Sequence, residues 1–324
     1  MKILVLGAGA VGSLLAARLS AAGNAVQLTG RPEHLRAIEA HGLRVDGTDP
    51  GTFRPDVADD LRRAATPEAV LLTVKTFGLA AAGAALGERF PRLVPTLLPQ
   101  NGLNVERSVV GPLGGAAGTD PTPWLVRVVN TLPATLIGPG VVRQAGNGEL
   151  LLRDPRAGGP ASAATELFRA LFEGTTVPVR LTRDLDRELW RKALVNAAIN
   201  PVTALHAVPN GRLSESPFRE EARALLREAT QAARSAGFSF SDTEADQELD
   251  RVVRATAGNR SSMLQDRDRG RPTEVDAISG EILRTAALHG IDLPATRAVV
   301  RQLESAGVAA GRAQPSYGDD RRRD

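Results

Sequence analysis

A run of glycines near the amino terminus constrains the fold of this chain more than any other feature. Gly7-Ala8-Gly9-Ala10-Val11-Gly12 has the spacing G-x-G-x-x-G and separates a short apolar segment at 3–6 from a helical pattern at 11–22. A second short apolar segment follows at 25–29. A strand, a helix and another strand in such close succession form a βαβ unit, which predicts a parallel sheet.

The spacing of these glycines suits a turn that binds phosphate. The first glycine permits a tight turn, the second lets the backbone approach a pyrophosphate, and the third lets the helix pack closely on the strand. The amino terminus of the helix then presents unpaired N–H groups to the phosphates. We therefore predict that a dinucleotide cofactor is bound by Gly7, Ala8, Gly9, Ala10, Val11 and Gly12.

The end of the second strand indicates which dinucleotide is bound. Proteins that bind NAD usually place an Asp or Glu here to hold the ribose hydroxyls, but this strand ends Leu28-Thr29-Gly30-Arg31 without an acid. The guanidinium of Arg31 suits a 2′-phosphate through its charge and its planar geometry. The sequence thus favours NADP as the cofactor, with an ordinary loop arginine as the alternative for Arg31.

The pattern of apolar residues changes near residue 182. Before it, helical and strand-like segments alternate at 33–40, 69–73, 79–86, 96–98 and within 126–152, and a Gly- and Pro-rich stretch at 112–123 predicts a loop. After it, helical periodicity dominates at 188–205, 218–236, 244–257 and 273–289. We predict an α/β N-terminal Rossmann-like dinucleotide-binding domain with a parallel sheet at 1–182, an all-α C-terminal domain at 183–311, and a disordered tail at 312–324.

The composition excludes several classes of function. The 324 residues contain no cysteine, which excludes disulfides, thiolate metal sites and a cysteine nucleophile, and we expect no metal site. The net charge is only +3, and the basic residues form no stripe of the kind that binds nucleic acid. No run of about 18 apolar residues indicates a membrane span. We expect a cytoplasmic protein whose partner is a small molecule rather than nucleic acid or a membrane.

A polar seam runs along the first predicted helix of the second half. Only Lys2, Lys75 and Lys192 are lysines among the 40 basic residues, and lysine can act as a proton donor where arginine stays protonated. Lys192, Asn196 and Asn200 are spaced i, i+4 and i+8, so they share one face of an otherwise apolar helix. Such groups need partners, which solvent, a neighbouring helix or the oxygens of a substrate would supply.

Reduction of a ketone would use such a seam. As hydride reaches a carbonyl carbon, negative charge grows on the oxygen, which must be stabilised and then protonated. Lys192 can supply both the charge and the proton. The four histidines, His34, His41, His206 and His289, lie in segments that do not look built for this role, and we expect them to be surface or structural residues.

Taken in order over about 290 residues, these motifs resemble those of the ketopantoate reductase (2-dehydropantoate 2-reductase) family. Gly7–Gly12 and Arg31 are similar to its NADP fingerprint and 2′-phosphate reader, and Thr73-Val74-Lys75 is similar to its lysine near the cofactor. The resemblance implies NADPH-dependent reduction of 2-dehydropantoate to pantoate, a step in pantothenate and coenzyme A synthesis. The remaining matches are Gln100-Asn101-Gly102, Leu189-Trp190-Arg191-Lys192 through Asn200-Pro201, Pro209-Asn210-Gly211, Ser261–Asp266 and Thr273–Asp276.

The resemblance also implies roles for individual residues. Lys192 would donate the proton to the nascent alkoxide, and Glu274, the second catalytic residue, would contact Lys192 or the substrate hydroxyl. Asn101 would lie between the nicotinamide and the substrate, with Lys75 on the cofactor side and the backbone of Ala134 touching the cofactor. The other residues implied to bind the substrate are Asn196, Asn200, Asn210 and Ser262.

Some alternatives stay open at this point. An acid that favours a helix dipole is the alternative for Glu274, and a helix cap is the alternative for Ser262. Gln100 stands where many members have His, 111–123 is richer in Gly and Pro, and Val128–Pro133 departs from a Thr-rich pattern beside the substrate. These departures leave open a paralogue that reduces another 2-keto acid, and a non-catalytic NADP-binding regulator. The oligomeric state is not fixed by the sequence, and a homodimer through the helical domain is one alternative.

Overall fold

The computed structural model describes residues 1–308, and the chain divides into two compact units. Of these residues, Met1–Gln100 and Val105–Leu185 belong to the first unit, and Asn101–Asn104 and the residues from Asp186 onward belong to the second. The sequence predicts one boundary, between 182 and 183, so the placement of Asn101–Asn104 in the second unit is a difference. The tail predicted at 312–324 lies outside the described residues.

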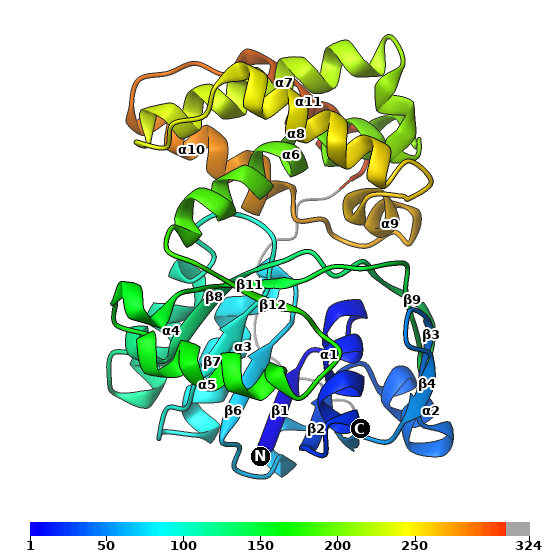
Figure 1. The fold of residues 1–324 in the computed structure, drawn as a ribbon, viewed down its shortest axis with the longest axis vertical. Coiled ribbons are helices and arrows are strands. Elements are labelled where there is room, and N and C mark those ends of the chain that lie inside the picture. The colour runs from blue at the N-terminus through cyan, green and yellow to red at the C-terminus, as the bar shows by residue number, and fades with distance from the viewer. Residues whose placement is uncertain (309–324) are drawn as a thin grey trace, which may run out of the picture. The chain divides into compact units, whose positions relative to one another are not determined.

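The first unit alternates strands and helices (Figure 1). Its strands are β1 (Lys2–Leu6), β2 (Ala25–Thr29), β3 (Leu43–Gly47), β4 (Gly51–Phe53), β5 (Asp56–Ala58), β6 (Ala69–Leu72), β7 (Thr96–Leu98), β8 (Leu125–Asn130), β9 (Ala134–Gly138), β10 (Val141–Gln144), β11 (Leu150–Arg153) and β12 (Val179–Thr182). Its helices are α1 (Ala10–Ala21), α2 (Pro32–His41), α3 (Leu79–Arg89), α4 (Arg107–Ala117) and α5 (Ser162–Glu173), with 3₁₀ turns η1 (Leu61–Arg63), η2 (Thr76–Gly78), η3 (Thr122–Trp124) and η4 (Pro155–Ala157).

Eight of these strands form one sheet in the order β12-β11-β8-β7-β6-β1-β2-β5. Every neighbouring pair in it is parallel except β11 with β8, so the predicted α/β fold is confirmed with one antiparallel pairing. Strand β1 pairs with β2 on one side and with β6 on the other, so the strand order reverses beside β1. Ligands of such sheets bind at the carboxyl ends of the strands, at this reversal.

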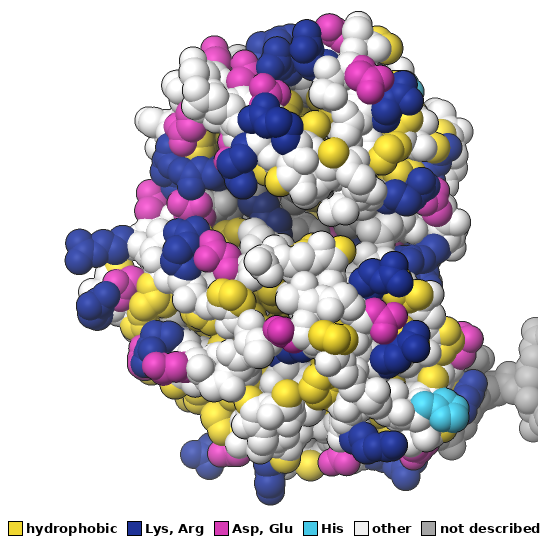
Figure 2. Space-filling view, turned by 45° about the vertical axis from the view of Figure 1, so that its right-hand side comes forward, with side chains coloured by type: hydrophobic (Ala, Val, Ile, Leu, Met, Phe, Trp, Pro, Cys, Tyr) yellow, Lys and Arg dark blue, Asp and Glu magenta, His cyan; other side chains and the backbone are white. Residues whose placement is uncertain are grey.

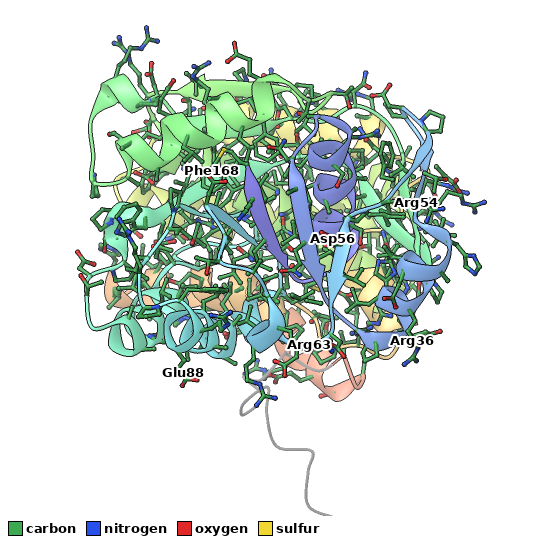
Figure 3. The ribbon with its side chains drawn as sticks, turned by 90° about the horizontal axis from the view of Figure 1, so that it is seen from below. Arg36, Arg54, Asp56, Arg63, Glu88 and Phe168 are labelled. Carbon is green, nitrogen blue, oxygen red and sulfur yellow. The ribbon has the colours of Figure 1, made fainter. Side chains whose placement is uncertain are left out.

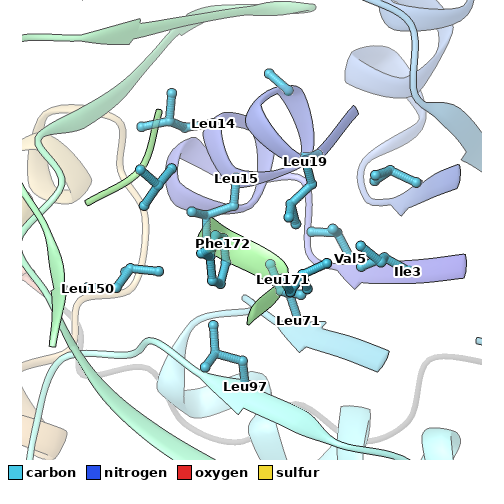
Figure 4. Packing of buried hydrophobic residues seen from close by; sticks show 14 of the residues in the cluster. Ile3, Val5, Leu14, Leu15, Leu19, Leu71, Leu97, Leu150, Leu171 and Phe172 are labelled. Atoms are coloured by element: carbon cyan, nitrogen blue, oxygen red, sulfur yellow. The ribbon is translucent and has the colours of Figure 1, made fainter. Parts of the chain in front are cut away.

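Both faces of the sheet are buried, which explains why its strands read as continuous apolar runs. Ile3 and Val5 point to the face covered by α1 and α5, whereas Leu4 points to the face covered by α3 and α4. Figure 4 shows the first of these faces, where side chains of α1 and α5 meet those of β1, β6, β7 and β11. In Figure 3, seen from below, Phe168 of α5 lies between its helix and the strands, and Glu88 of α3 points outward.

A second sheet of four strands, β4-β3-β10-β9, packs against the other side of α1. The buried guanidinium of Arg18 on α1 holds this sheet, donating to the carbonyls of Thr48 and Asp49 and to Oε1 of Gln144 over 2.6–2.8 Å. This second sheet was not predicted from the sequence. It depends on the parallel pairing of β3 with β10, whose residues lie about a hundred positions apart, so a local pattern cannot reveal it.

The prediction of a loop at 112–123 is wrong for the first half of that stretch. Residues Arg107–Ala117 form α4, with Pro112 inside the helix. Small residues allow α4 to lie close to α3. A Cβ added to Gly87 of α3 would stand 2.7 Å from Ala116 and from the carbonyl of Leu113 on α4. Tertiary packing therefore outweighs the low helix propensity of this stretch.

The second unit is helical, as predicted. Its helices are α6 (Leu185–His206), α7 (Phe218–Ser235), α8 (Asp242–Ala255), α9 (Ser262–Asp268), α10 (Glu281–Leu288) and α11 (Pro294–Ser305), with a 3₁₀ turn η5 (Asn210–Ser214) and a π-helical turn η6 (Asp276–Gly280). Helix α6 supplies Ala193, Leu194, Ala198 and Val202 to a core that it shares with α7, α8, α10 and α11. The helix predicted at 273–289 is a π-helical turn followed by α10.

Charges of both signs lie side by side on the surface of each unit. Figure 2 shows Lys and Arg side chains next to Asp and Glu on the visible face. Ion pairs also form within single helices, such as Arg169 with Glu166 and Arg251 with Glu248, both at 2.7 Å. Among residues 1–308, none of the helices combines the length and the apolarity needed to cross a membrane.

Candidate functional site

The predicted phosphate-binding turn lies where β1 ends and α1 begins. Gly7 has a φ of +120°, and a Cβ added to it would stand 2.6 Å from the backbone nitrogen of Val74, at the end of β6. The N–H groups of Gly7 and Ala8 both donate to the carbonyl of Thr29, at 3.2 and 2.7 Å. The turn is therefore held against the carboxyl ends of β2 and β6, and only glycine fits its first position.

The third glycine of the motif sets how closely α1 approaches β1. A Cβ on Gly12 would stand 2.2 Å from the carbonyl of Gly7 and 2.4 Å from Oγ1 of Thr73, and that hydroxyl donates to the same carbonyl over 2.8 Å. The space beside Gly9 is open, because a Cβ there would meet no atom of residues 1–308 within 4 Å. The cap of α1 has no side-chain hydrogen bond and its first turn has no acid, so its N–H groups can receive an anion.

Arg31 lies two residues beyond β2 and is the residue before the first turn of α2. It is exposed. Gly30, which precedes it, lies against the turn, since a Cβ on Gly30 would stand 2.5 Å from that of Ala8. The structure thus brings the predicted 2′-phosphate reader and the predicted pyrophosphate turn together at the carboxyl end of β2.

Two further residues predicted on the cofactor side belong to the same unit. Lys75 follows β6, is half-buried and engaged in a contact, and its carbonyl accepts from Gly78 over 2.8 Å. Ala134 begins β9 and packs on the apolar cluster that also receives Ala8 and Val11. Lys75 therefore lies beside the turn in the main sheet, whereas Ala134 approaches it from the second sheet.

The residues that depart from the family pattern have structural partners. The Nε2 of Gln100 donates to the carbonyls of Leu72 and Val74, which joins the carboxyl ends of β7 and β6. Val128 and Leu132 are buried in the core of the unit. Two residues of the segment Val128–Pro133, which was expected beside the substrate, therefore pack in the core.

The polar seam on α6 is present, and its burial increases along the helix. Lys192 and Asn196 are half-buried, and Lys192 is engaged in a contact, while Asn200 is only 5% exposed. The residues beside them, such as Ala193 and Ile199, lie in the helical core. The seam is therefore a strip of polar groups at the edge of an apolar helix rather than a solvated face.

The residue before Ser262 contacts α6 one turn after the polar seam. Oγ1 of Thr203, one turn after Asn200, donates to Oγ of Ser261 over 2.7 Å, and this hydroxyl caps α9 by accepting from the N–H of Leu264. Ser261, and not Ser262, is thus the cap. Ser262 begins α9 and is half-buried.

Asn210 is fixed by its own contacts within the helical unit. Its Nδ2 donates to Oγ1 of Thr256 over 2.9 Å, and its backbone N–H donates to the carbonyl of Asn259. Its Oδ1 is buried and has no hydrogen-bond partner among residues 1–308. No role was predicted for Thr203, Ser261 or Thr256, although the pair Ser261-Ser262 before a short helix is a recognisable cap signal.

Glu274 is buried, with 6% of its surface exposed. It lies just before the π-helical turn η6, and its Oε2 accepts from Nδ2 of Asn101 over 3.3 Å. A buried carboxylate needs such partners, because burying a charge alone is very unfavourable. Asn101 and Glu274, predicted to serve one site, are therefore in contact within the second unit.

The arrangement can perform two tasks. The first unit offers backbone N–H groups and an arginine to a phosphorylated dinucleotide. The second offers an ammonium, a carboxylate and several amides to a small oxygen-rich molecule. Residues 1–308 contain no group of three or more His, Asp and Glu side chains that could hold a metal ion.

Comparison with known proteins gives two family matches. Residues 3–156 match the family described as ketopantoate reductase PanE/ApbA, and residues 184–306 match its C-terminal domain. A 2-dehydropantoate 2-reductase of Halobacterium salinarum is 36% identical over 304 residues, which is 92% of this chain and 96% of that protein.

Solved structures agree with this match. A PanE/ApbA family ketopantoate reductase from Ralstonia eutropha superposes with a TM-score of 0.80 at 28% identity, covering 95% of this chain and 99% of that one. A D-mandelate dehydrogenase with NADH and anilino(oxo)acetate has a TM-score of 0.83 over 95% of this chain and 98% of its own, but at 23% identity it shows the fold alone.

Proposed function

This chain belongs to the ketopantoate reductase family, and we propose that it uses NADPH to reduce 2-dehydropantoate to pantoate, a step in pantothenate synthesis. The observation that carries the proposal is the position of Lys192. It is a half-buried lysine in a polar seam beside an apolar core, in a chain whose first unit has a turn built for a dinucleotide.

The geometry of the glycine turn at 7–12 suits the binding of NADPH. A Cβ would clash at Gly7 and Gly12 but not at Gly9, where the backbone must come near a pyrophosphate. Arg31 would pair with the 2′-phosphate, and Lys75 would lie on the side of the nicotinamide. When bound, NADPH supplies the hydride that reaches the keto carbon.

Lys192 acts on the oxygen of the substrate. Its ammonium stabilises the negative charge that grows on the carbonyl oxygen and then gives that oxygen its proton, so the alkoxide becomes the hydroxyl of the product. The neutral amine regains a proton from solvent before the next turnover. Arginine would not serve here, because its guanidinium does not release a proton at neutral pH.

The remaining polar residues hold the substrate. The buried carboxylate of Glu274 accepts from the substrate hydroxyl or from Lys192, and its bond to Asn101 keeps the amide oriented between nicotinamide and substrate. Hydrogen bonds to the other oxygens of the substrate come from Asn196, Asn200, Asn210 and Ser262. A regulator that only senses NADP would need none of these groups.

Steady-state turnover tests the proposal. Ketopantoate and a panel of 2-keto acids of different bulk are each supplied with NADPH and with NADH. The oxidation of whichever cofactor is supplied is followed by absorbance. We expect ketopantoate with NADPH to give the highest kcat/KM. A higher value for another 2-keto acid would favour the paralogue, and tight NADPH binding without turnover on the whole panel would favour the regulator.

We place the reaction in the cytoplasm, which cell fractionation tests. We also propose a homodimer through the helical unit, which light scattering on the purified protein tests.

A further inference from the structure

The segment Asn101–Asn104 lies shortly after β7 in the chain. It belongs to the helical unit, although the residues up to Gln100 and from Val105 belong to the first unit. Leu103 is 6% exposed and packs in the helical core with Ile278 and Ile282. The segment Asn101–Asn104 therefore reaches the helical unit as an inserted piece of chain. Its first residue, Asn101, touches Glu274.

The backbone of this segment is fitted to the π-helical turn η6. The N–H of Leu103 donates to the carbonyl of Ala277 over 3.3 Å. Gly102 has a φ of +100°, and a Cβ there would stand 2.4 Å from the same carbonyl. A π-helical turn is uncommon and often occurs at functional sites, and here its widened backbone receives the inserted segment.

A chain of side-chain contacts closes the other end of the segment. Nδ2 of Asn104 donates to Oε1 of Glu281 over 2.7 Å, and Oε2 of Glu281 accepts from Nε of Arg284 over 2.7 Å. Arg284 returns to the π-helical turn, donating to Oδ1 of Asp276 over 2.8 Å. Asn104 itself has a φ of +52°, a conformation in which asparagine is tolerated better than most residues.

The segment thus has one polar anchor at each end, with two residues between them. Two residues, Gly102 and Leu103, separate Asn104, which contacts Glu281, from Asn101, which contacts Glu274, so one four-residue segment links the two contacts. We propose that Asn104, acting through Glu281, is a positioning residue for the pair Asn101–Glu274. This inference rests on the proposed function, because the pair is placed at the substrate there.

A charge swap tests the proposal. Asn104→Asp replaces the donor with a carboxylate facing Glu281, and we expect kcat for ketopantoate to fall about tenfold, with the KM for NADPH changed less than twofold. Glu281→Gln alone keeps an acceptor for Asn104 and should stay within about threefold of the unaltered enzyme. The double variant Asn104→Asp/Glu281→Gln restores a donor and an acceptor in reversed order, and should recover kcat to within about threefold of Glu281→Gln.

A second cycle shows whether Asn104 acts through the pair. With Glu274→Ala, Asn101 has lost this acceptor, so adding Asn104→Asp should lower kcat by less than twofold further. Asn147→Asp and Glu304→Gln, both exposed, are the matched controls and should leave kcat unchanged. Melting temperatures are measured for every variant, because a merely structural role would lower stability without this pattern in kcat.

The outcomes separate the two proposals. If the unaltered enzyme does not oxidise NADPH with ketopantoate, the proposed function fails and the positioning role fails with it. If the unaltered enzyme is active, but Asn104→Asp equals it, or the swap restores nothing, or Asn104→Asp lowers kcat equally with and without Glu274, only the positioning role is overturned.

Discussion

The side-chain amide of Asn101 donates a hydrogen bond to the carboxylate of Glu274 over 3.3 Å, joining residues 173 positions apart. Asn101 lies three residues beyond the end of β7, and Glu274 lies two residues before the π-helical turn η6. Because the carboxylate is buried, its orientation depends on the partners that the fold provides. The contact lies within the helical unit, to which both Asn101 and Glu274 belong.

The contact predicts a difference between two substitutions of Glu274. Glu274→Gln keeps an oxygen that accepts from Asn101, whereas Glu274→Ala leaves the amide without it, so we expect the larger fall in kcat from Glu274→Ala, on the order of 10²-fold. Steady-state kinetics with ketopantoate measure both. Equal kcat values for the two variants would contradict a role for this contact, and Glu304→Ala on the exposed face of α11 is the control.

Arg31→Ala should change the choice of cofactor. Loss of charge-assisted hydrogen bonds to the 2′-phosphate corresponds to about 1.5–3 kcal/mol, so the KM for NADPH should rise by about tenfold or more while the KM for NADH stays unchanged. Arg36 lies on α2, which begins directly after Arg31, and points outward (Figure 3), which makes Arg36→Ala the matched control. An unchanged ratio of the two KM values in Arg31→Ala would refute the assignment of NADP to this site.

Gly9→Ala and Gly12→Ala form a pair with opposite expectations for stability. At Gly12 a Cβ would stand 2.2 Å from the carbonyl of Gly7, whereas at Gly9 it would meet no atom within 4 Å in the described part of the chain. We expect Gly12→Ala to lower the melting temperature. Gly9→Ala should keep it, yet weaken NADPH binding, because the methyl group occupies the approach of the pyrophosphate. Fluorescence titration with NADPH decides, and unchanged affinity in Gly9→Ala would argue against a phosphate at this turn.

His34 should make stability depend on pH. It is buried, its Nδ1 accepts from the N–H of Gly140 over 2.9 Å, and its Nε2 lies 3.0 Å from Oγ of Ser13 on α1. Burial lowers the pKa of His34 below its usual 6.5, although the charge of Glu33 acts in the opposite direction. Below about pH 6.5, His34 therefore binds a proton more readily in the unfolded chain than in the folded one.

The free energy of unfolding should thus keep its full value above about pH 6.5 and fall as the pH decreases through the lowered pKa of His34. Urea unfolding at pH 7.5 and 5.5 measures the difference. His34→Gln should reduce the dependence on pH, and His41→Gln, at an exposed position, should retain it. A pH dependence that is the same in His34→Gln and in the unaltered protein would contradict this account.

Local patterns were sufficient to predict the first βαβ unit and the polar seam of α6. The glycine spacing at 7–12 needs only the strand before it and the helix after it, and i, i+4 spacing places Lys192 and Asn196 on one face of any helix. The histidines are predicted to be surface or structural residues, and His34 is buried with two hydrogen-bond partners, Ser13 and Gly140.

Long-range packing explains what the sequence did not reveal. Gly111 and Pro112 disfavour a helix locally, and α4 forms there because glycines of α3 let it lie close. The second sheet depends on β3 and β10, which are distant in the chain. The placement of Asn104 in the helical unit depends on Glu281, 177 residues away, and no local period carries that information.

The central claim is that Lys192 gives its proton to the reduced substrate, and the kinetics of Lys192→Ala test it most directly. With NADPH affinity measured by fluorescence and kcat by NADPH oxidation with ketopantoate, the account predicts a fall in kcat of about 10²-fold or more and an NADPH Kd within twofold of the unaltered enzyme. Lys2→Ala, at an exposed lysine, should change neither. Small and equal effects on kcat and on NADPH binding in Lys192→Ala would contradict the account.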